Sequence, residues 1–323
     1  MIGKILVYES SSYNPYINIA TEKHLFDTLP ENTLTVFLWQ NEKTVVIGRN
    51  QNPWSECRPT LLKESGGYLA RRLSGGGAVF HDLGNLCFTF IAKDCDYSLI
   101  KNLEVIKNAC RKADINAEFT GRNDLTADGR KFSGNAFYSS GGKTCHHGTV
   151  LIKASPENMS RFLTPSKAKL SSKGVQSVRS RVVNLSELSP SLTPVLMMEY
   201  IISSLSEVFG VSPFICEEIP TETVSKQSAS LASDEWLFGT AIPFSVCFEG
   251  AFPWGEIKLL FNVKNGIINA VESYTDAMDA DIPLELKNTL LGCEYKKETV
   301  AAAIKNALTE PLADDIIGII DIE

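Results

Sequence analysis

The residues with the clearest potential for chemistry lie between 71 and 82, Arg-Arg-Leu-Ser-Gly-Gly-Gly-Ala-Val-Phe-His-Asp. Each glycine loses more backbone entropy on ordering than any other residue, so three in a row need a compensating role. Glycines let backbone N–H groups approach a ligand closely, and arginines beside them suit phosphate or carboxylate oxygens. The stretch therefore predicts an anion-binding loop. A flexible hairpin tip, the alternative, leaves the arginine pair unexplained.

A second chemically dense stretch runs from 121 to 149. Asp128-Gly129 is a strong hairpin signal, which places Lys131 near the start of the returning strand as a fixed positive charge. Asn123 and Asp124 offer the hard oxygen ligands that Mg²⁺ accepts beside substrate phosphates. Surface ion pairs around a turn are the alternative reading for the charged residues.

Two adjacent histidines, His146 and His147, close this stretch. Neighbouring strand residues point to opposite faces of a sheet, so the pair cannot bind one metal ion without distortion. We expect one of them to be packed and the other to be polar.

A third stretch is basic: no acidic residue occurs between Glu157 and Glu187, and six lysines or arginines lie there. A solvated face and a nucleic-acid patch are the ordinary interpretations. The segment has one aromatic residue, Phe162, and the chain carries a net charge of −7, so nucleic acid is disfavoured. A phosphate-binding loop remains the favoured interpretation.

Composition sets the class of protein. The chain has 323 residues, 44% of them hydrophobic, which predicts one large domain or two ordinary ones. The first thirty residues lack a signal-like apolar stretch and no run of eighteen apolar residues occurs, so we expect a cytoplasmic protein with no membrane contact. Eight cysteines without a CxxC motif indicate reduced thiols and no structural metal. Residues 244–323 carry a net charge of −8, and residues 1–243 carry +1.

The elements that must position these residues can be outlined. Asn14-Pro15 predicts a helix start, and the apolar spacing of 99–113 predicts a long amphipathic helix. The runs 33–39 and 43–48 predict a hairpin, and strands 68–73 and 86–92 flank the glycine loop. Asn265-Gly266 predicts a second hairpin in a smaller C-terminal unit.

Taken together, these motifs resemble the lipoate-protein ligase A family of the class II biotin/lipoate protein ligase superfamily, over essentially the whole chain. The segments that carry the resemblance are 45–54 (VVIGRNQNPW), 71–85 (RRLSGGGAVFHDLGN), 121–125 (GRNDL), 128–136 (DGRKFSGNA), 146–149 (HHGT), 173–181 (KGVQSVRSR) and 235–239 (EWLFG).

The resemblance implies an α+β fold with two domains. Residues 1–233 would form a large catalytic domain with mixed β-sheets flanked by helices. Residues 234–243 would be a linker, and 244–323 a small α+β C-terminal accessory domain. Residues 310–323 depart from the family pattern, and no role is assigned to them.

The implied activity is that of an ATP-dependent lipoate-protein ligase. Lipoate and ATP, with Mg²⁺, would give lipoyl-AMP and pyrophosphate. The lipoyl group would then pass to a lysine ε-amine on a lipoyl domain of a 2-oxoacid dehydrogenase E2 subunit or on the glycine-cleavage H protein. We expect a monomer that has these protein partners and no nucleic acid.

The resemblance also implies site residues. Lys131 would be catalytic, bridging the carboxylate and the α-phosphate, and Asn123 and Asp124 would contact magnesium. ATP and the adenylate would contact Arg71, Gly76, Gly77, Ala78, Val79, Lys131, Ala136, Lys173, Ser177, Val178 and Arg179. Lipoate would contact Arg72, Ser74, Gly75, Gly76, Lys131, Gly134 and His147.

Other activities occur on the fold that the resemblance implies. Octanoyl transferases use a cysteine nucleophile shortly before the lysine hairpin, and no cysteine occurs between Cys110 and Cys145. The sequence leaves two alternatives: a transferase that uses preformed lipoyl-AMP, and a non-catalytic protein that binds lipoate or a nucleotide. It also does not decide between lipoate and octanoate.

Overall fold

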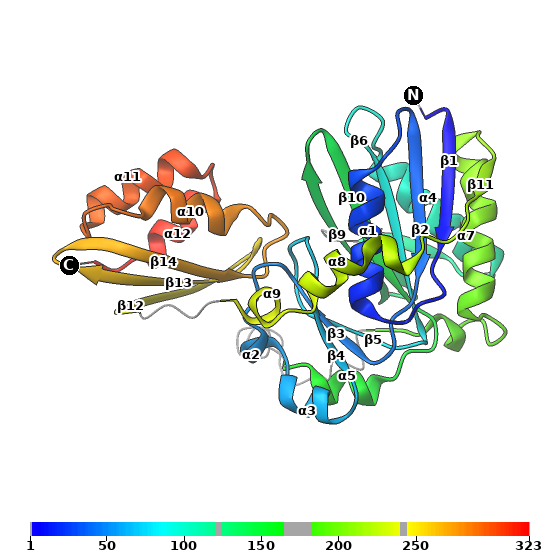
Figure 1. Cartoon of the computed structure of the whole chain (residues 1–323), viewed down its shortest axis with the longest axis horizontal. Helices are drawn as coiled ribbons and strands as arrows, with labels where there is room; N and C mark the ends of the chain where they lie inside the picture. The colour runs from blue at the N-terminus through cyan, green and yellow to red at the C-terminus, as the bar shows by residue number, and fades with distance from the viewer. Residues whose placement is uncertain (1, 121–123, 165–181, 240–243, 323) are drawn as a thin grey trace.

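The computed structural model describes residues 2–120, 124–164, 182–239 and 244–322, which form a larger N-terminal unit and a smaller C-terminal unit (Figure 1). The larger unit is built on a mixed eight-stranded sheet with the strand order β11-β1-β2-β6-β10-β9-β8-β7. The pairs β11–β1 and β1–β2 are parallel and the others antiparallel. The strands are β1 (Lys4–Glu9), β2 (Thr33–Trp39), β6 (Asn85–Lys93), β7 (Ala117–Thr120), β8 (Asp124–Ala127), β9 (Arg130–Ser140), β10 (Lys143–Leu151) and β11 (Pro213–Ile215).

Helices cover both faces of this sheet. α1 (Pro15–Asp27) and α8 (Thr221–Leu231) lie on one face, and α4 (Leu99–Lys112) and α7 (Pro194–Phe209) lie on the other (Figure 1). Strand β6 has apolar side chains on both faces. Phe88 and Phe90 pack in the core between the sheet and helices α4 and α7, whereas Cys87 and Ile91 pack in the core between the sheet and helices α1 and α8. A strand covered on both faces is apolar throughout, and β6 is buried over nearly all of its length.

A second, three-stranded sheet carries the glycine loop. It has the order β4-β3-β5, with β3 (Thr44–Ile47), β4 (Tyr68–Arg71) and β5 (Val79–His81). The hairpin predicted for 33–48 is therefore wrong: β2 belongs to the large sheet, and β3 pairs with β4 and β5. Strands β2 and β3 are buried along their whole length, so their hydrophobic pattern does not specify which strand each pairs with. Short helices flank this sheet: α2 (Pro53–Glu56), α3 (Pro59–Glu64) and α5 (Pro156–Phe162). The 3₁₀ turn Leu185–Glu187 instead places Leu185 in the core of the large sheet.

Local turn and cap chemistry behaves as the sequence predicts. The Asn14 side chain accepts a hydrogen bond from the Tyr16 amide at the start of α1. Asp128 and Gly129 join β8 to β9 with φ values of 49° and 70°. Asn265 and Gly266 do the same between β13 and β14 with 54° and 74°.

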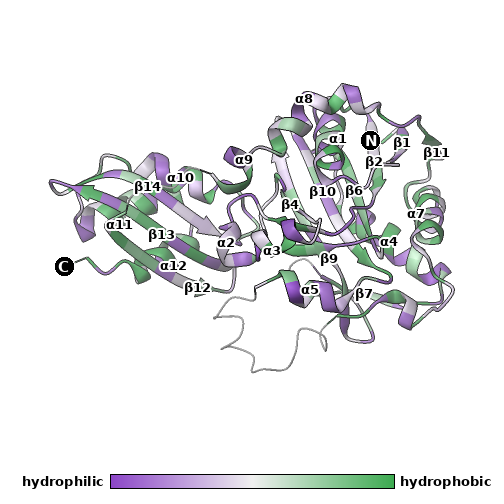
Figure 2. Ribbon diagram, turned by 60° about the horizontal axis from the view of Figure 1, so that its bottom comes forward, coloured by the Kyte–Doolittle hydropathy of each residue, from purple (hydrophilic) through white to green (hydrophobic). Residues whose placement is uncertain are grey.

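The C-terminal unit is a three-stranded antiparallel sheet covered by three helices. The strands are β12 (Val246–Phe252), β13 (Gly255–Lys264) and β14 (Ile267–Thr275), and the helices are α10 (Ile282–Leu290), α11 (Lys297–Ala307) and α12 (Leu312–Ile319). Alternate residues of β13, Ile257, Leu259 and Phe261, enter the core of this unit, as expected of a sheet with one covered face, and the strand carries both hydrophobic and hydrophilic residues (Figure 2). Residues 310–323, unassigned from the sequence, include α12, and Ile316 of this helix is fully buried in the core.

The two units touch at the glycine loop. The Gly76 amide donates to the Ala277 carbonyl oxygen at 2.9 Å, and the Thr275 amide donates to the Asn50 carbonyl oxygen at 3.0 Å. A Cβ on Gly75 would lie 2.3 Å from the Ala277 carbonyl oxygen, so this contact requires glycine. No described helix has the length and hydropathy to cross a membrane.

Candidate functional site

A cavity of about 170 Å³ lies under the glycine loop, between α1 and the strands β9 and β10. Nine residues predicted for ATP or lipoate line it: Arg72, Gly76, Gly77, Ala78, Val79, Lys131, Gly134, Ala136 and His147. Nine further residues line it without having been predicted: Ile19, Glu22, Trp39, Val46, His81, Cys87, Asn135, Gly148 and Thr149. Folding thus brings the glycine loop, the lysine hairpin and helix α1 to one pocket.

Lys131 is held at the mouth of this cavity. Its Nζ lies 2.6 Å from Oδ1 of Asp124, across the β8–β9 hairpin. A Cβ on Gly134 would lie 3.2 Å from Nζ, so the absence of a side chain at 134 leaves room for the lysine. The Lys131 side chain is 38% exposed, which leaves the amine accessible to a ligand at the cavity mouth.

Other predicted residues of this region lie outside the described residues. They are Asn123, Lys173, Ser177, Val178 and Arg179. The chain re-enters the described part beside Lys131, because Val182 forms a bridge with it and the Val183 amide donates to its carbonyl oxygen at 2.9 Å. Of the predicted magnesium pair, the structure describes Asp124, in its ion pair with Lys131.

Arg72 shapes the glycine loop from inside. Its guanidinium donates to the carbonyl oxygens of Gly75 at 2.7 Å and Gly77 at 2.8 Å, and to Oγ of Ser74 at 3.1 Å. Burial lowers the pKa of Arg72 to about 10, although the Glu22 carboxylate opposes the shift. Gly76 has a φ of 89°, and a Cβ there would lie 2.9 Å from Nη2 of Arg72. A side chain at position 76 would therefore displace the Arg72 guanidinium that holds the loop.

Arg71, its neighbour, has a different environment. Its guanidinium donates to five backbone carbonyl oxygens, those of Gly48, Arg49, Gln51, Trp236 and Leu237. The last two belong to α9 (Asp234–Phe238), a helix at the start of the predicted linker. The phosphate contact predicted for Arg71 would require the guanidinium to leave several of these carbonyls.

A buried hydrogen-bonded chain links the glycine loop to helix α1. Oγ of Ser74 lies 2.7 Å from Nε2 of His147, and Nδ1 of His147 lies 2.8 Å from Oε1 of Glu22. The Thr89 hydroxyl also donates to Glu22, at 2.7 Å, and accepts from the Trp39 indole at 3.2 Å. Ser74 and Glu22 have 0% and 1% exposure, so this chain positions the loop from beneath.

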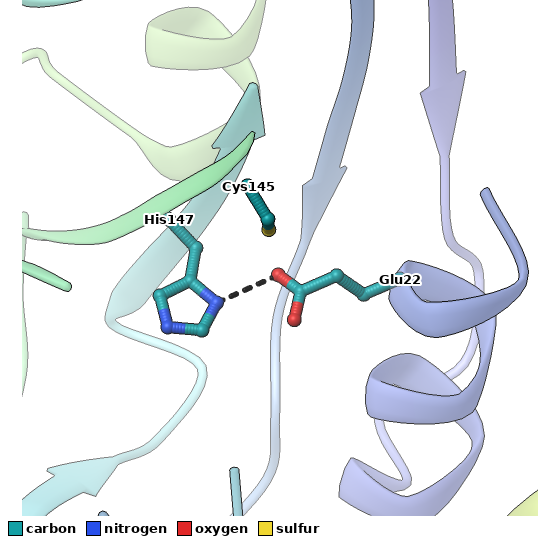
Figure 3. A group of neighbouring side chains, drawn as sticks. All are labelled: Glu22, Cys145 and His147. Atoms are coloured by element: carbon teal, nitrogen blue, oxygen red, sulfur yellow. Dashed lines mark hydrogen bonds and ion pairs between the residues drawn. The ribbon is translucent and has the colours of Figure 1, made fainter. Parts of the chain in front are cut away.

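Glu22 also lies close to Cys145. Ligand atoms of Glu22, Cys145 and His147 lie within 4.8 Å of one another, and the three side chains face one another across α1 and β10 (Figure 3). Carboxylate, thiolate and imidazole are all ligands that Zn²⁺ accepts. In the structure, however, the Glu22 carboxylate and both ring nitrogens of His147 already form hydrogen bonds within the protein, so these groups do not need a metal ion to be paired.

Sequence reasoning did not find Glu22. It is a carboxylate on the buried side of α1, whose buried residues include Ile19, Ala20 and Leu25. A charged residue on the apolar face of a helix is the signal that could have identified it, since such a group needs buried partners.

His146 faces the opposite side of β10. Its Nε2 lies 2.9 Å from Oδ1 of Asn135, its Nδ1 lies 3.3 Å from the Asn102 amide nitrogen, and its ring stacks on Phe137. Burial, with a smaller contribution from His147, lowers the pKa of His146 to about 3. The two histidines lie on opposite faces of β10, as the sequence predicts, but the contrast of one packed and one polar residue is wrong, because both are buried and both are hydrogen-bonded.

The cysteines are free thiols. Burial raises the pKa of Cys110 to about 12 and raises that of Cys145 well above its usual range. Because the thiolate is the nucleophile, neither environment favours a thioester route.

The large mixed sheet flanked by helices and the smaller C-terminal sheet unit define an α+β fold, in which the glycine loop and Lys131 meet at one cavity. Residues 14–209 match the family described as the lipoyl protein ligase A/B catalytic domain, and residues 241–317 match the bacterial lipoate protein ligase C-terminus. The first match covers more than half of the chain. The protein therefore belongs to the lipoyl protein ligase A/B family.

Solved structures agree with this assignment. P. falciparum LipL1 in complex with lipoate superposes with a TM-score of 0.84 at 28% identity, over 98% of each chain. Lipoate-protein ligase A bound with ATP matches with a TM-score of 0.63 at 23% identity, over 74% of this chain and 99% of that one. The bi-partite lipoate protein ligase of T. acidophilum, solved in a study with its E2 lipoyl domain, matches with a TM-score of 0.62 at 24% identity, over 76% and 100%. The last two share the fold.

Proposed function

We propose that the protein is an ATP-dependent lipoate-protein ligase that works in two steps. The lipoate carboxylate attacks the α-phosphate of ATP, which forms lipoyl-AMP and releases pyrophosphate. A lysine ε-amine of an acceptor lipoyl domain then attacks the acyl carbonyl, and AMP leaves. The observation that carries the proposal is the placement of Lys131, an accessible ammonium at the mouth of the cavity beneath the glycine loop.

The cavity supports the assignment of the acyl group. Its wall includes the apolar side chains of Ile19, Trp39, Val46 and Val79, which suit an aliphatic chain. The charged groups at its mouth suit the carboxylate end. An acid bound with its chain inward would therefore present its carboxylate to Lys131.

Positioning and charge neutralisation account for the first step, since phosphoryl transfer needs little covalent participation from the protein. We assign Lys131 to the developing charge between the carboxylate and the α-phosphate. ATP brings Mg²⁺, and the Asp124 carboxylate, which lies beside Lys131, is a hard ligand suited to it. Approach of the metal to Asp124 would loosen its ion pair and release the lysine toward substrate.

The remaining assignments follow the family resemblance. The basic segment that contains Lys173, Ser177, Val178 and Arg179 would close over the adenylate and exclude water. The acceptors would be lipoyl domains of 2-oxoacid dehydrogenases and the H protein; the E2 lipoyl domain studied with the T. acidophilum ligase supports this class. The accessory unit would act mainly in the first step, through its contact with Gly76.

The test is lipoate- and magnesium-dependent ATP–pyrophosphate exchange without acceptor, with Lys131→Ala as the reference. Exchange in the wild type that is lost in the variant supports adenylation centred on Lys131. Absence of exchange, with transfer from supplied lipoyl-AMP intact, would make the protein a lipoyltransferase and refute the ligase proposal. Absence of both would leave a lipoate or nucleotide binder.

A further inference from the structure

The inner part of the cavity contains a histidine that the proposed reaction does not use. His81 lies on β5 and is 4% exposed, whereas Lys131 at the mouth is 38% exposed. His81 lines the cavity with Trp39 and Cys87. Among the described residues, nothing hydrogen-bonds to its Nε2 atom.

The protonation of this ring follows from its neighbours. The Asn18 side-chain amide nitrogen donates to the backbone carbonyl oxygens of Ser12 at 2.9 Å and Gln40 at 2.8 Å, which orients the Asn18 side chain. The same nitrogen lies 3.0 Å from Oδ1 of Asn41, so this Asn41 atom is the acceptor. The Asn41 amide nitrogen must then face Nδ1 of His81, at 3.2 Å.

Nδ1 of His81 is therefore an acceptor, and the ring proton belongs on Nε2. The Cys87 thiol, 3.5 Å from Nδ1, is a second potential donor to the same atom. Burial, with the charges of Arg72 and His147, lowers the pKa of His81 to about 3, so the ring is neutral at pH 7. Backbone carbonyls thus fix the tautomer through Asn18 and Asn41.

A buried N–H donor without an acceptor is destabilising. Because His81 is buried against the cavity, an occupant of the cavity can supply the missing acceptor. An acid whose carboxylate lies at the exposed Lys131 would extend its chain into the buried part of the same cavity, whose lining includes His81. The sequence does not decide between lipoate and octanoate, and these two acids differ at the end of that chain. Lipoate ends in a dithiolane ring with two sulfur atoms, and octanoate ends in an alkyl chain.

We propose that Nε2–H of His81 donates a hydrogen bond to a dithiolane sulfur of bound lipoate and thereby selects a cyclic disulfide acid over a straight-chain fatty acid. The inference rests on the proposed function, since it takes lipoate as the cavity's occupant. A sulfur atom is a weak hydrogen-bond acceptor, but octanoate offers no acceptor at all and leaves Nε2–H of His81 unpaired. A buried donor left unpaired lowers the affinity for the wrong ligand more than a purely apolar pocket does.

The first test needs no substitution. ¹⁵N NMR of the histidine rings in the free protein should show His81 protonated at Nε2, and the Nε2 resonance should move on addition of lipoate and much less on addition of octanoate. Protonation at Nδ1, or equal shifts with the two acids, would overturn the proposal.

The second test compares affinities by calorimetry. His81→Phe keeps a ring but removes the donor, and should reduce the preference for lipoate over octanoate by about tenfold, whereas His81→Gln, which keeps an N–H donor, should retain part of it. Val46→Ala, an apolar change in the same cavity, should weaken both acids alike. Equal losses for both acids in His81→Phe would refute the role of His81 while leaving the ligase proposal intact. Failure of the wild type to bind either acid would refute both.

Discussion

The two faces of strand β10 present the same residue type to opposite kinds of environment. His146 points into the core beneath α4 and α7, where two asparagines satisfy its ring nitrogens. His147 points to the cavity, where it joins Ser74 of the glycine loop to Glu22 of helix α1. Burial and hydrogen bonding therefore do not by themselves identify a functional histidine. What distinguishes His147 is that its own ring lines the cavity and joins Glu22, another lining residue, to the glycine loop.

The same division extends along β9. Phe132 is fully buried in the α4–α7 core, and Lys131 beside it is held at the cavity mouth. One face of the hairpin should therefore determine stability and the other should determine chemistry. Substitutions on each face can test this division.

The largest effect is expected on the core face. Phe132→Ala should lower the free energy of unfolding by about 3–5 kcal/mol, because it removes a fully buried ring and leaves a cavity. Urea unfolding measures this loss. Phe119→Ala, at a residue that is 42% exposed, is the matched control and should change stability far less.

On the cavity face, Lys131→Ala should reduce adenylate formation by about a hundredfold or more, because it removes the charge beside the reacting groups. Its unfolding midpoint should stay close to that of the wild type. Lys153→Ala, which removes an exposed lysine, should leave the rate unchanged. A large loss of stability in Lys131→Ala would contradict the separation of the two faces.

Glu22→Ala should affect both properties, since the carboxylate is buried and supports the loop from beneath. Loss of the carboxylate removes the acceptor of the Thr89 hydroxyl hydrogen and the partner of Nδ1 of His147, which should destabilise the protein by about 1–3 kcal/mol and weaken lipoate binding. Glu22→Gln keeps an acceptor oxygen and should recover most of the stability. Thermal unfolding and calorimetric titration with lipoate provide the two readouts.

The last effect is small at neutral pH and grows as the pH falls. His146 has a pKa near 3 in the folded protein against 6.5 as its ordinary value, so the unfolded chain takes up a proton first as the pH falls. Its contribution to stability is complete above about pH 6.5 and is lost progressively toward pH 3, by at most about 1.4 kcal/mol per pH unit. His146→Gln should flatten this part of the stability profile relative to the wild type. An unchanged slope would show that the ring is not held neutral by the core.

Much of the fold was predictable because its signals are local. Asp128-Gly129 and Asn265-Gly266 need positive φ, so each marks a hairpin wherever the strands pack. The 33–48 hairpin failed for the opposite reason: strands buried on both faces have no alternation, and sequence proximity was a poor guide to pairing.

The candidate site was predictable in outline. The glycine loop and Lys131 were identified from residue types that are hard to explain as scaffold, and the cavity brings them together. Glu22 and His81 were missed because each is an ordinary residue on an ordinary element until its distant partners are known.

By itself, the sequence determined the turns, the helix starts, the family and two charged residues of the cavity, Arg72 and Lys131, since each follows from local backbone preference or from an ordered set of motifs. The tertiary structure alone decided what adjacent identical residues do. Arg71 is directed to carbonyls of helix α9, more than 160 positions away, while Arg72 shapes the glycine loop; His146 enters the core, while His147 enters the cavity. The physical reason is that a buried polar side chain is defined by its hydrogen-bond partners, and those partners meet only when distant segments pack.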